Sequence, residues 1–139
     1  MDVHVERPFG RPMPPFDPAA PPVEEFFGIA PGAGTETRLD LADRLRNPWG
    51  ILHGGGLAVL ADVAACRAVT ALDGHRPDRP VTAADTVLHF LRPARVGPVE
   101  ARCQILGDGI GRALVRVAIH DRGAGDRLVT LGSVLVLTD

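Results

Sequence analysis

The amino-acid sequence predicts an α+β fold in which an antiparallel β-sheet wraps around one long central α-helix. One long segment, from about Gly55 to Leu72, is rich in Ala and Leu. From Val81 onward the hydrophobic pattern changes to a period of two, which is typical of strands. An early strand, one long helix and then four consecutive strands is an order in which the sheet must cover the helix on one face.

The chain begins with a segment that is unsuited to a helix or to the interior of a sheet. Residues 7–22 contain seven prolines, which fix φ and remove backbone donors. We therefore assign residues 1–22 to an extended proline-rich arm and residues 23–139 to a single domain. Glu24 to Ile29 is predicted as a short helix or a lead-in strand. In Thr35 to Leu41, Thr and Leu alternate with charged residues, which predicts a half-buried strand.

The long segment after the turn at Asn47-Pro48 predicts a helix from about Gly55 to Leu72. Asp73-Gly74 is its stop signal. The alanines of this segment occur on several faces of the helix, so neighbouring elements must approach it closely from more than one side. We expect this helix to lie buried at the centre of the fold.

Four strands are predicted after the helix. Apolar and polar residues alternate from Val99 to Ile105 and from Ala113 to His120. Val81 to Leu91 and Leu128 to Leu137 supply the other two strands. The breaks between them are short and glycine-rich, as hairpin connections should be, and they span residues 93–98, 107–111 and 121–126.

Composition and charge argue against several classes of function. A chain of 139 residues with 45% hydrophobic content suits one domain with one core. The formal net charge is -2 and Arg is spread along the chain, which predicts no nucleic-acid partner. The longest mainly apolar run, residues 51–72, is interrupted by charged residues and glycines, and the N-terminus carries no apolar signal segment. A soluble, cytoplasmic protein without a membrane partner is therefore expected.

The cysteines and histidines predict neither a metal site nor a separate cofactor. Cys66 and Cys103 are isolated thiols without a metal-ligand pattern, which is typical of reduced cysteines in a cytosolic core. The five histidines show no i, i+4 pair and no arrangement with carboxylates that would bind a metal ion. His89 and His120, on predicted strands, are interpreted as structural.

A run of three glycines, Gly54 to Gly56, opens the predicted helix directly after His53. The N-terminus of a helix presents unpaired N–H groups and partial positive charge. The amides of Gly54 and Gly55 are therefore candidates to hold a carbonyl oxygen that gains charge during acyl transfer. The alternative is that the glycines only permit a tight turn between a strand and the helix.

Asp62 is the second unusual residue of this helix. It lies among aliphatic residues, where a carboxylate is costly to bury without a partner. Such a carboxylate is disposed to act as a base or a nucleophile. The alternative is a solvated or salt-bridged helix residue, paired with Arg67 or with the N-terminal arm.

Two strings of residues resemble a known family. They are Asn47-x-x-Gly50-x-x-His53-Gly54-Gly55 followed by Leu60-Ala61-Asp62, and Phe90-Leu91-Arg92-Pro93-Ala94 with Gly97. In residue type and spacing they resemble the PaaI-like branch of the hotdog-fold acyl-CoA thioesterases, which includes relatives of 4-hydroxybenzoyl-CoA thioesterase. The resemblance covers roughly Ile29 to Leu137 and leaves the proline-rich arm outside.

The resemblance implies a hotdog fold and the hydrolysis of an acyl-CoA or aroyl-CoA thioester to a free acid and CoA. It implies that the Gly54 amide polarises the thioester carbonyl and that Asp62 activates water or attacks directly. Asn47 would orient the water or the carbonyl. His53 would pack and form hydrogen bonds within the loop, beside Gly55.

Further substrate contacts are expected outside this motif. Many relatives place a Ser or Thr near the start of the next strand, a position that falls here on Ala83, with Thr82 one step away. Because CoA carries phosphates, Arg92, Arg95 and Arg112 are candidate contacts for it.

The spacing of the two principal site residues predicts an oligomer. Gly54 and Asp62 are eight residues apart, which is roughly 12 Å along a helix axis. If both act on one thioester, Asp62 must come from a second subunit, and the active site lies across a dimer interface. The resemblance implies the same homodimer, which often pairs into a homotetramer.

Two other functions on the same fold compete with hydrolysis. One is a non-hydrolytic protein that binds acyl-CoA or senses a ligand, since a fold alone does not determine function. The presence of both Asn47 and Asp62 argues against it. The other is a dehydratase or hydratase, but the spacing of histidines and carboxylates does not supply the acid and base that such a reaction needs. The acyl group of the substrate stays open at this stage.

Overall fold

The computed structural model describes residue 19 and residues 22–32, 35–72, 74–76 and 78–138. The predicted proline-rich arm, residues 1–22, therefore lies almost entirely outside the described residues. Within them, no helix is long and apolar enough to cross a membrane.

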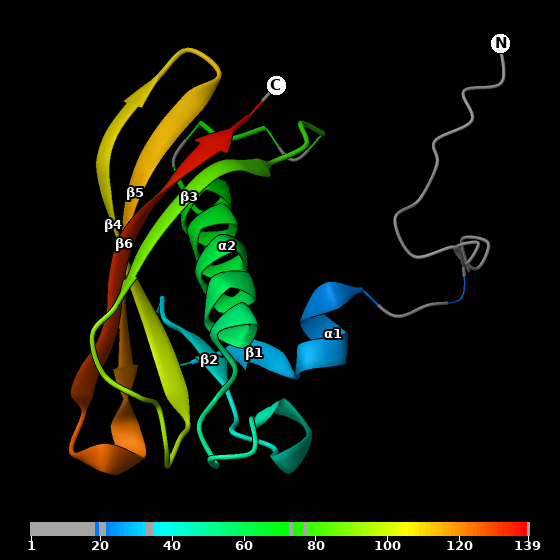
Figure 1. Ribbon diagram of the computed structural model, residues 1–139. Helices are drawn as coiled ribbons and strands as arrows, with labels where there is room; N and C mark the ends of the chain where they lie inside the picture. Colours follow the sequence, from blue (N-terminus) through cyan, green and yellow to red (C-terminus); the bar gives the residue numbers. More distant parts are fainter. Residues whose placement is uncertain (1–18, 20–21, 33–34, 73, 77, 139) are drawn as a thin grey trace, which may run out of the picture.

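A six-stranded antiparallel sheet packs around one long helix, as Figure 1 shows, which confirms the predicted α+β hotdog architecture. The strands follow the order β1-β2-β4-β5-β6-β3 across the sheet. The elements along the chain are α1 (Val23–Phe27), β1 (Ile29–Pro31), β2 (Thr37–Leu39), the 3₁₀ turn η1 (Asp43–Leu45), α2 (Gly54–Thr70), β3 (Thr82–Phe90), β4 (Val99–Gly109), β5 (Arg112–Asp121), the 3₁₀ turn η2 (Arg122–Ala124) and β6 (Arg127–Leu137).

The central helix α2 begins after a cap residue and runs to Thr70 through a segment rich in Ala and Leu. His53 is the N-cap residue, and its side chain accepts a hydrogen bond from the Gly55 amide. Leu60, Ala61 and Ala65 are completely buried against the sheet. The small side chains of Ala61 and Ala65 let the strands approach the helix closely, which agrees with the predicted central position.

The sheet differs from the sequence prediction at the β4–β5 hairpin and at the N-terminal edge. β4 continues through Gly107 and Gly109, which the sequence assigns to a break, because a bulge between Ile105 and Gly107 keeps these residues in the ladder. The tight turn lies at Ile110 and Gly111 instead. At the other edge, β1 and β2 have only three residues each, and the ladder between them consists of the three pairs Ile29–Leu39, Ala30–Arg38 and Pro31–Thr37.

Asp121, the last residue of β5, holds the loop of residues 95–97 through hydrogen bonds. Asp121 is completely buried, and its carboxylate accepts hydrogen bonds from the backbone amides of Arg95, Val96 and Gly97 at 2.8 to 3.1 Å. Burial by itself would raise the pKa of Asp121, but these amide hydrogen bonds outweigh it and hold the pKa below its usual value. A charged side chain on a strand therefore fixes a loop that is distant in sequence.

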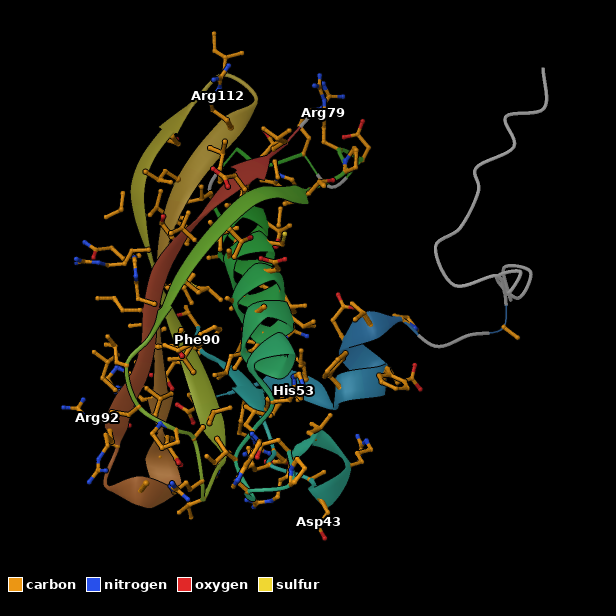
Figure 2. The ribbon with its side chains drawn as sticks, in the orientation of Figure 1. Asp43, His53, Arg79, Phe90, Arg92 and Arg112 are labelled. Carbon is orange, nitrogen blue, oxygen red and sulfur yellow. The ribbon has the colours of Figure 1, made fainter. Side chains whose placement is uncertain are left out.

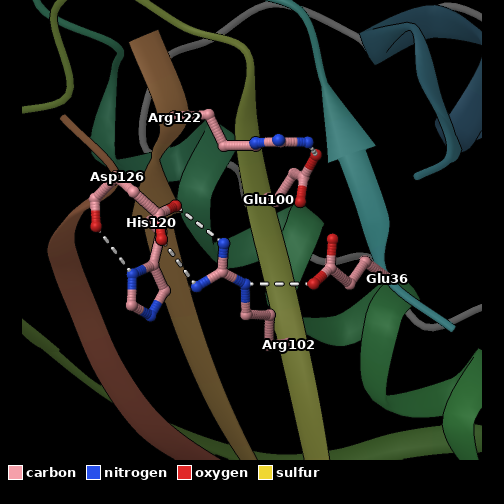
Figure 3. A network of polar contacts seen from close by, with 6 residues as sticks. All are labelled: Glu36, Glu100, Arg102, His120, Arg122 and Asp126. Carbon is pink, nitrogen blue, oxygen red and sulfur yellow. Dashed lines mark hydrogen bonds and ion pairs between the residues drawn. The ribbon is translucent and has the colours of Figure 1, made fainter. Parts of the chain in front are cut away.

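A polar network joins the N-terminal part of the sheet to β4 and to the β5–β6 connection (Figure 3). Arg102 of β4 binds Glu36 on one side and Asp126 on the other, at 3.1 and 2.7 Å. Glu100, which is 1% exposed, binds Arg122 at 2.7 Å. The Glu36 carboxylate is consequently held in a fixed position next to strand β2.

Candidate active site

The helix N-terminus presents one free backbone donor. The amide of Gly55 donates to Nδ1 of His53 at 3.3 Å, and the amide of Gly56 donates to the carbonyl oxygen of His53 at 2.8 Å. No acceptor is found for the amide of Gly54 among the residues that the structure describes. Of the two predicted oxyanion donors, Gly54 is thus the available one, whereas Gly55 is engaged in capping.

The loop before the helix is closed by Asn47. Its Oδ1 accepts hydrogen bonds from the backbone amides of Trp49 and Ile51, at 3.0 and 3.1 Å. Gly50 adopts a φ of +73°, a conformation that favours glycine, and the Arg46 guanidinium binds its carbonyl at 2.7 Å. The side-chain oxygen of Asn47 is therefore used to shape the loop, and its Nδ2 is the group left for a substrate or water.

Phe90, at the end of β3, lies beside the helix N-terminus. A Cβ atom added to Gly54 would lie 3.5 Å from the Phe90 ring. The ring is 58% exposed and, with Gly54, Leu57 and Arg92, it lines an open cavity of about 320 Å³. Phe90 opens the second string that resembles the family, but no role beside Gly54 could be assigned to it from sequence, because only the packing of β3 against α2 brings it to the glycine.

Asp62 lies two helical turns further along α2, facing strand β3. Oγ1 of Thr86 donates a hydrogen bond of 2.6 Å to Oδ1 of Asp62. Both residues are half-buried. Within the described residues Asp62 forms no ion pair, and Arg67 is therefore not its partner. The carboxylate is accessible and oriented by a hydroxyl, which is the arrangement that a base or nucleophile requires.

Thr86, and not Thr82 or Ala83, is the residue of β3 that contacts Asp62. The register of β3 against β6 shifts between Ala83 and Asp85 through a bulge. Thr86 lies between this bulge and Phe90, and its hydroxyl is the one that reaches Asp62. The sequence signal for Thr86, a hydroxyl residue four positions before Phe90, is weak.

Cys66 follows Asp62 by one turn and borders the same side of α2. Burial, together with the negative charge of Asp62, raises the pKa of the Cys66 thiol. A raised pKa favours the neutral thiol, so Cys66 is less reactive than an exposed cysteine. Among the residues that the structure describes, no three His, Cys, Asp or Glu side chains are grouped so as to hold a metal ion.

The predicted CoA-binding arginines separate into two groups. Arg92 lines the cavity next to Gly54, and Arg95 belongs to the loop that Asp121 holds. Arg112 lies with Arg79 at the opposite end of the molecule, beyond the C-terminal end of α2, as Figure 2 shows. Within one chain, Arg112 does not share a site with Gly54.

Gly54 and Asp62 do not meet within one chain. They are separated by two turns of the continuous helix α2, or about 12 Å along its axis. The same spacing is repeated on β3, where their neighbours Phe90 and Thr86 are four residues apart, or about 13 Å. The Gly54 amide and the Asp62 carboxylate of one chain are therefore too far apart to act on the same thioester.

Comparisons with known proteins agree with this fold. The sequence profile of the thioesterase superfamily matches residues 50–127, and the chain therefore belongs to that superfamily. This region contains Gly54, Asp62 and Thr86. A comparison with curated proteins found no match.

Solved structures give the same result for the fold. Conserved protein PA5202 from Pseudomonas aeruginosa is 28% identical, with a TM-score of 0.73, over 84% of this chain and 92% of that chain. The BH2602 protein from Bacillus halodurans, whose structure contains CoA, is 22% identical with a TM-score of 0.71, over 82% and 73% of the two chains. Thioesterase HI1161 from Haemophilus influenzae is 22% identical with a TM-score of 0.69, over 84% and 81%.

Proposed function

We propose that this protein hydrolyses an acyl-CoA or aroyl-CoA thioester to the free acid and CoA. The observation that carries the proposal is a pair of groups on helix α2. The Asp62 carboxylate is held by Thr86 of strand β3, and the amide of Gly54, at the helix N-terminus, has no acceptor among the described residues. Membership of the thioesterase superfamily supports thioester chemistry. The bound CoA in the Bacillus halodurans structure supports CoA as the carrier, and the residue pattern favours the PaaI-like branch.

In the proposed reaction, the N–H of Gly54 donates a hydrogen bond to the thioester carbonyl oxygen. Thr86 occupies Oδ1 of Asp62, which leaves Oδ2 to accept a proton from water. The water oxygen bonds to the carbonyl carbon, and the carbonyl oxygen gains negative charge beside the Gly54 amide and the positive end of the helix dipole. The C–S bond then breaks, and CoA leaves as a thiolate that takes up the proton. Direct attack by Asp62 would instead give an anhydride, which water then cleaves.

We further propose that two chains pair through strand β3. In the described structure β3 pairs only with β6, so its other edge has free backbone groups. Residues directly opposite one another in an antiparallel pair project to the same face. A two-fold axis at Leu88 therefore sets Thr86 opposite Phe90 of the partner subunit. Asp62 would then lie next to Gly54 of the partner subunit, and one dimer would contain two complete sites.

The cavity beside Gly54 suggests where the CoA moiety lies. Arg92 lines this cavity and is our proposed phosphate contact, with Arg95 in the neighbouring loop. Arg112 is a phosphate contact only if CoA extends to the far end of the other subunit. Asn47 can contribute its Nδ2, and His53 holds the helix start by capping.

Replacing Thr86 by Val is expected to lower kcat about tenfold or more and to change KM little. Thr86 is a positioning residue, and a hydrogen bond to a charged group contributes about 1.5–3 kcal/mol. Thr86→Ser keeps the hydroxyl and is expected to restore most of the activity. Thr130→Val is a matched control, because the Thr130 hydroxyl is buried without a partner in the described structure. Full kcat in Thr86→Val, measured by thiol release, would contradict this role.

Mixing two inactive variants tests the shared site. Random pairing of Asp62→Asn and Gly54→Pro subunits makes about half of the dimers mixed, and each mixed dimer has one site with both groups intact. We expect about one quarter of the wild-type rate, measured by thiol release from a panel of acyl-CoAs. An inactive mixture with active wild type would place both groups in one chain. No turnover by wild type would reject hydrolysis and favour the acyl-CoA-binding alternative.

A further inference from the structure

A second cavity lies on the other side of the central helix. It has a volume of about 520 Å³ and is enclosed by α2, the segment leading into β2, and strand β4. The sheet order places β2 and β4 two strands or more away from β3, where Asp62 and Thr86 lie. Exposed Thr35 and Ala71 belong to its lining, so solvent reaches it. This volume is within the range of small-molecule binding sites.

Arg67 supplies an unused cationic donor in the wall of this cavity. Its Nη1 atom is buried and has no hydrogen-bond partner, and no ion pair of Arg67 is found in the part of the chain that the structure describes. The acidic residue of the lining, Glu36, is bound to Arg102. A buried, unpaired guanidinium N–H is costly. An acceptor within the cavity would remove this cost.

Thr37 supplies a second unused polar group on the facing wall. The residue is 2% exposed and points inward from β2. No hydrogen bond of its hydroxyl is found among the described residues. A cation on the helix and a hydroxyl on the strand, both without partners, therefore line the same cavity.

The remaining lining limits the ligand. Ala68, Cys103 and Ile105 make one part apolar, and burial raises the pKa of the Cys103 thiol to about 11, so this residue is uncharged. The Glu36 carboxylate, held in place by the network of Figure 3, disfavours a ligand with more than one negative charge. An apolar body with a single anionic group satisfies all of these features.

We propose that this cavity binds a small monocarboxylate, with its carboxylate at Arg67 and Thr37 and its hydrocarbon part against Ala68, Cys103 and Ile105. The site is separate from the one at Gly54 and Asp62. The proposed reaction releases acids of this chemical class, so an acid product would also be a ligand of the second site.

Calorimetric titration of the full-length protein with hexanoate tests the proposal. Arg67→Met keeps an apolar stem of similar length, and we expect it to weaken hexanoate binding at least about tenfold. Arg116→Met, which changes an exposed arginine of β5, should bind hexanoate like wild type. Hexan-1-ol and hexyl phosphate should bind more weakly than hexanoate, because the first lacks a charge and the second meets Glu36. Tighter binding of either ligand would overturn the proposal.

Labelling of the two cysteines shows which site is occupied. Cys103 lines the second cavity, whereas Cys66 lies near Asp62. Hexanoate should slow maleimide modification of Cys103, measured by mass spectrometry, and leave Cys66 unchanged. Protection of Cys66 alone, or equal affinity in Arg67→Met, would overturn the proposal. Thermal unfolding checks that Arg67→Met folds. If this variant does not fold, Thr37→Val takes its place and is expected to bind hexanoate several-fold more weakly than wild type.

Discussion

Replacing Asp62 by Asn is expected to lower kcat for thioester hydrolysis by about 10²- to 10⁴-fold, the usual contribution of a general base. The amide keeps the size of the side chain and still accepts the hydrogen bond from Thr86, but it takes no proton from water. KM should change little, because the carboxylate does not bind the CoA moiety. Release of free thiol from a panel of acyl-CoAs, measured under saturating conditions, gives kcat directly.

A matched control tests whether the loss of kcat comes from the missing base or from the missing negative charge alone. Asp108→Asn removes the same charge from an exposed position on β4, far from α2's N-terminus, and should leave kcat unchanged. Thermal unfolding of Asp62→Asn should resemble that of wild type, because Asp62 forms no ion pair in the described structure. A folded Asp62→Asn variant with wild-type turnover would exclude Asp62 as base or nucleophile.

Replacing Gly54 by Pro is expected to lower kcat by about 10²- to 10³-fold, the effect of removing one oxyanion donor. Proline is well tolerated at the first position of a helix, where its missing N–H has no intrahelical partner. The preceding residue, His53, already has a ψ of 134°, a conformation that is compatible with a following proline. The substitution therefore deletes the proposed donor while the helix is kept.

Gly54→Ala is the control for this experiment, since it retains the amide and adds only a Cβ. That atom would lie 3.5 Å from the Phe90 ring, which is an ordinary contact distance. We expect Gly54→Ala to keep activity within a few-fold of wild type. Equal loss in the Ala and Pro variants would mean that space beside Phe90, and not the amide, is what the reaction needs.

The local signals in the sequence predicted the main elements within a few residues. Helix α2 begins at Gly54, one residue before the predicted start at about Gly55, and strand β3 was predicted one residue too long at each end. The glycines at 107 and 109 were misinterpreted as a break. Glycine has no side-chain requirement that excludes it from a ladder, so a bulge accommodates these residues within β4.

The chemistry of the site was only partly accessible from sequence. Gly54 and Asp62 stood out because glycines at a helix start and an acid among aliphatic residues are unusual. The identity of the hydroxyl at Asp62 was not accessible, because the position of β3 along α2 is set by the packing of the sheet on the helix. The capping hydrogen bond that Nδ1 of His53 accepts from the Gly55 amide depends on a side-chain rotamer that no residue pattern specifies.

The amino-acid sequence by itself determined the fold class and the segment from Asn47 to Asp62, because hydrophobic period, capping and residue spacing are properties of neighbouring residues. Only the tertiary structure decided that Thr86 orients Asp62, that Phe90 borders Gly54 and that β3 is left at an edge of the sheet. It alone placed Arg67 and Thr37 in one cavity. These pairs come from segments far apart in the chain, and strand register, bulges and helix packing bring them together.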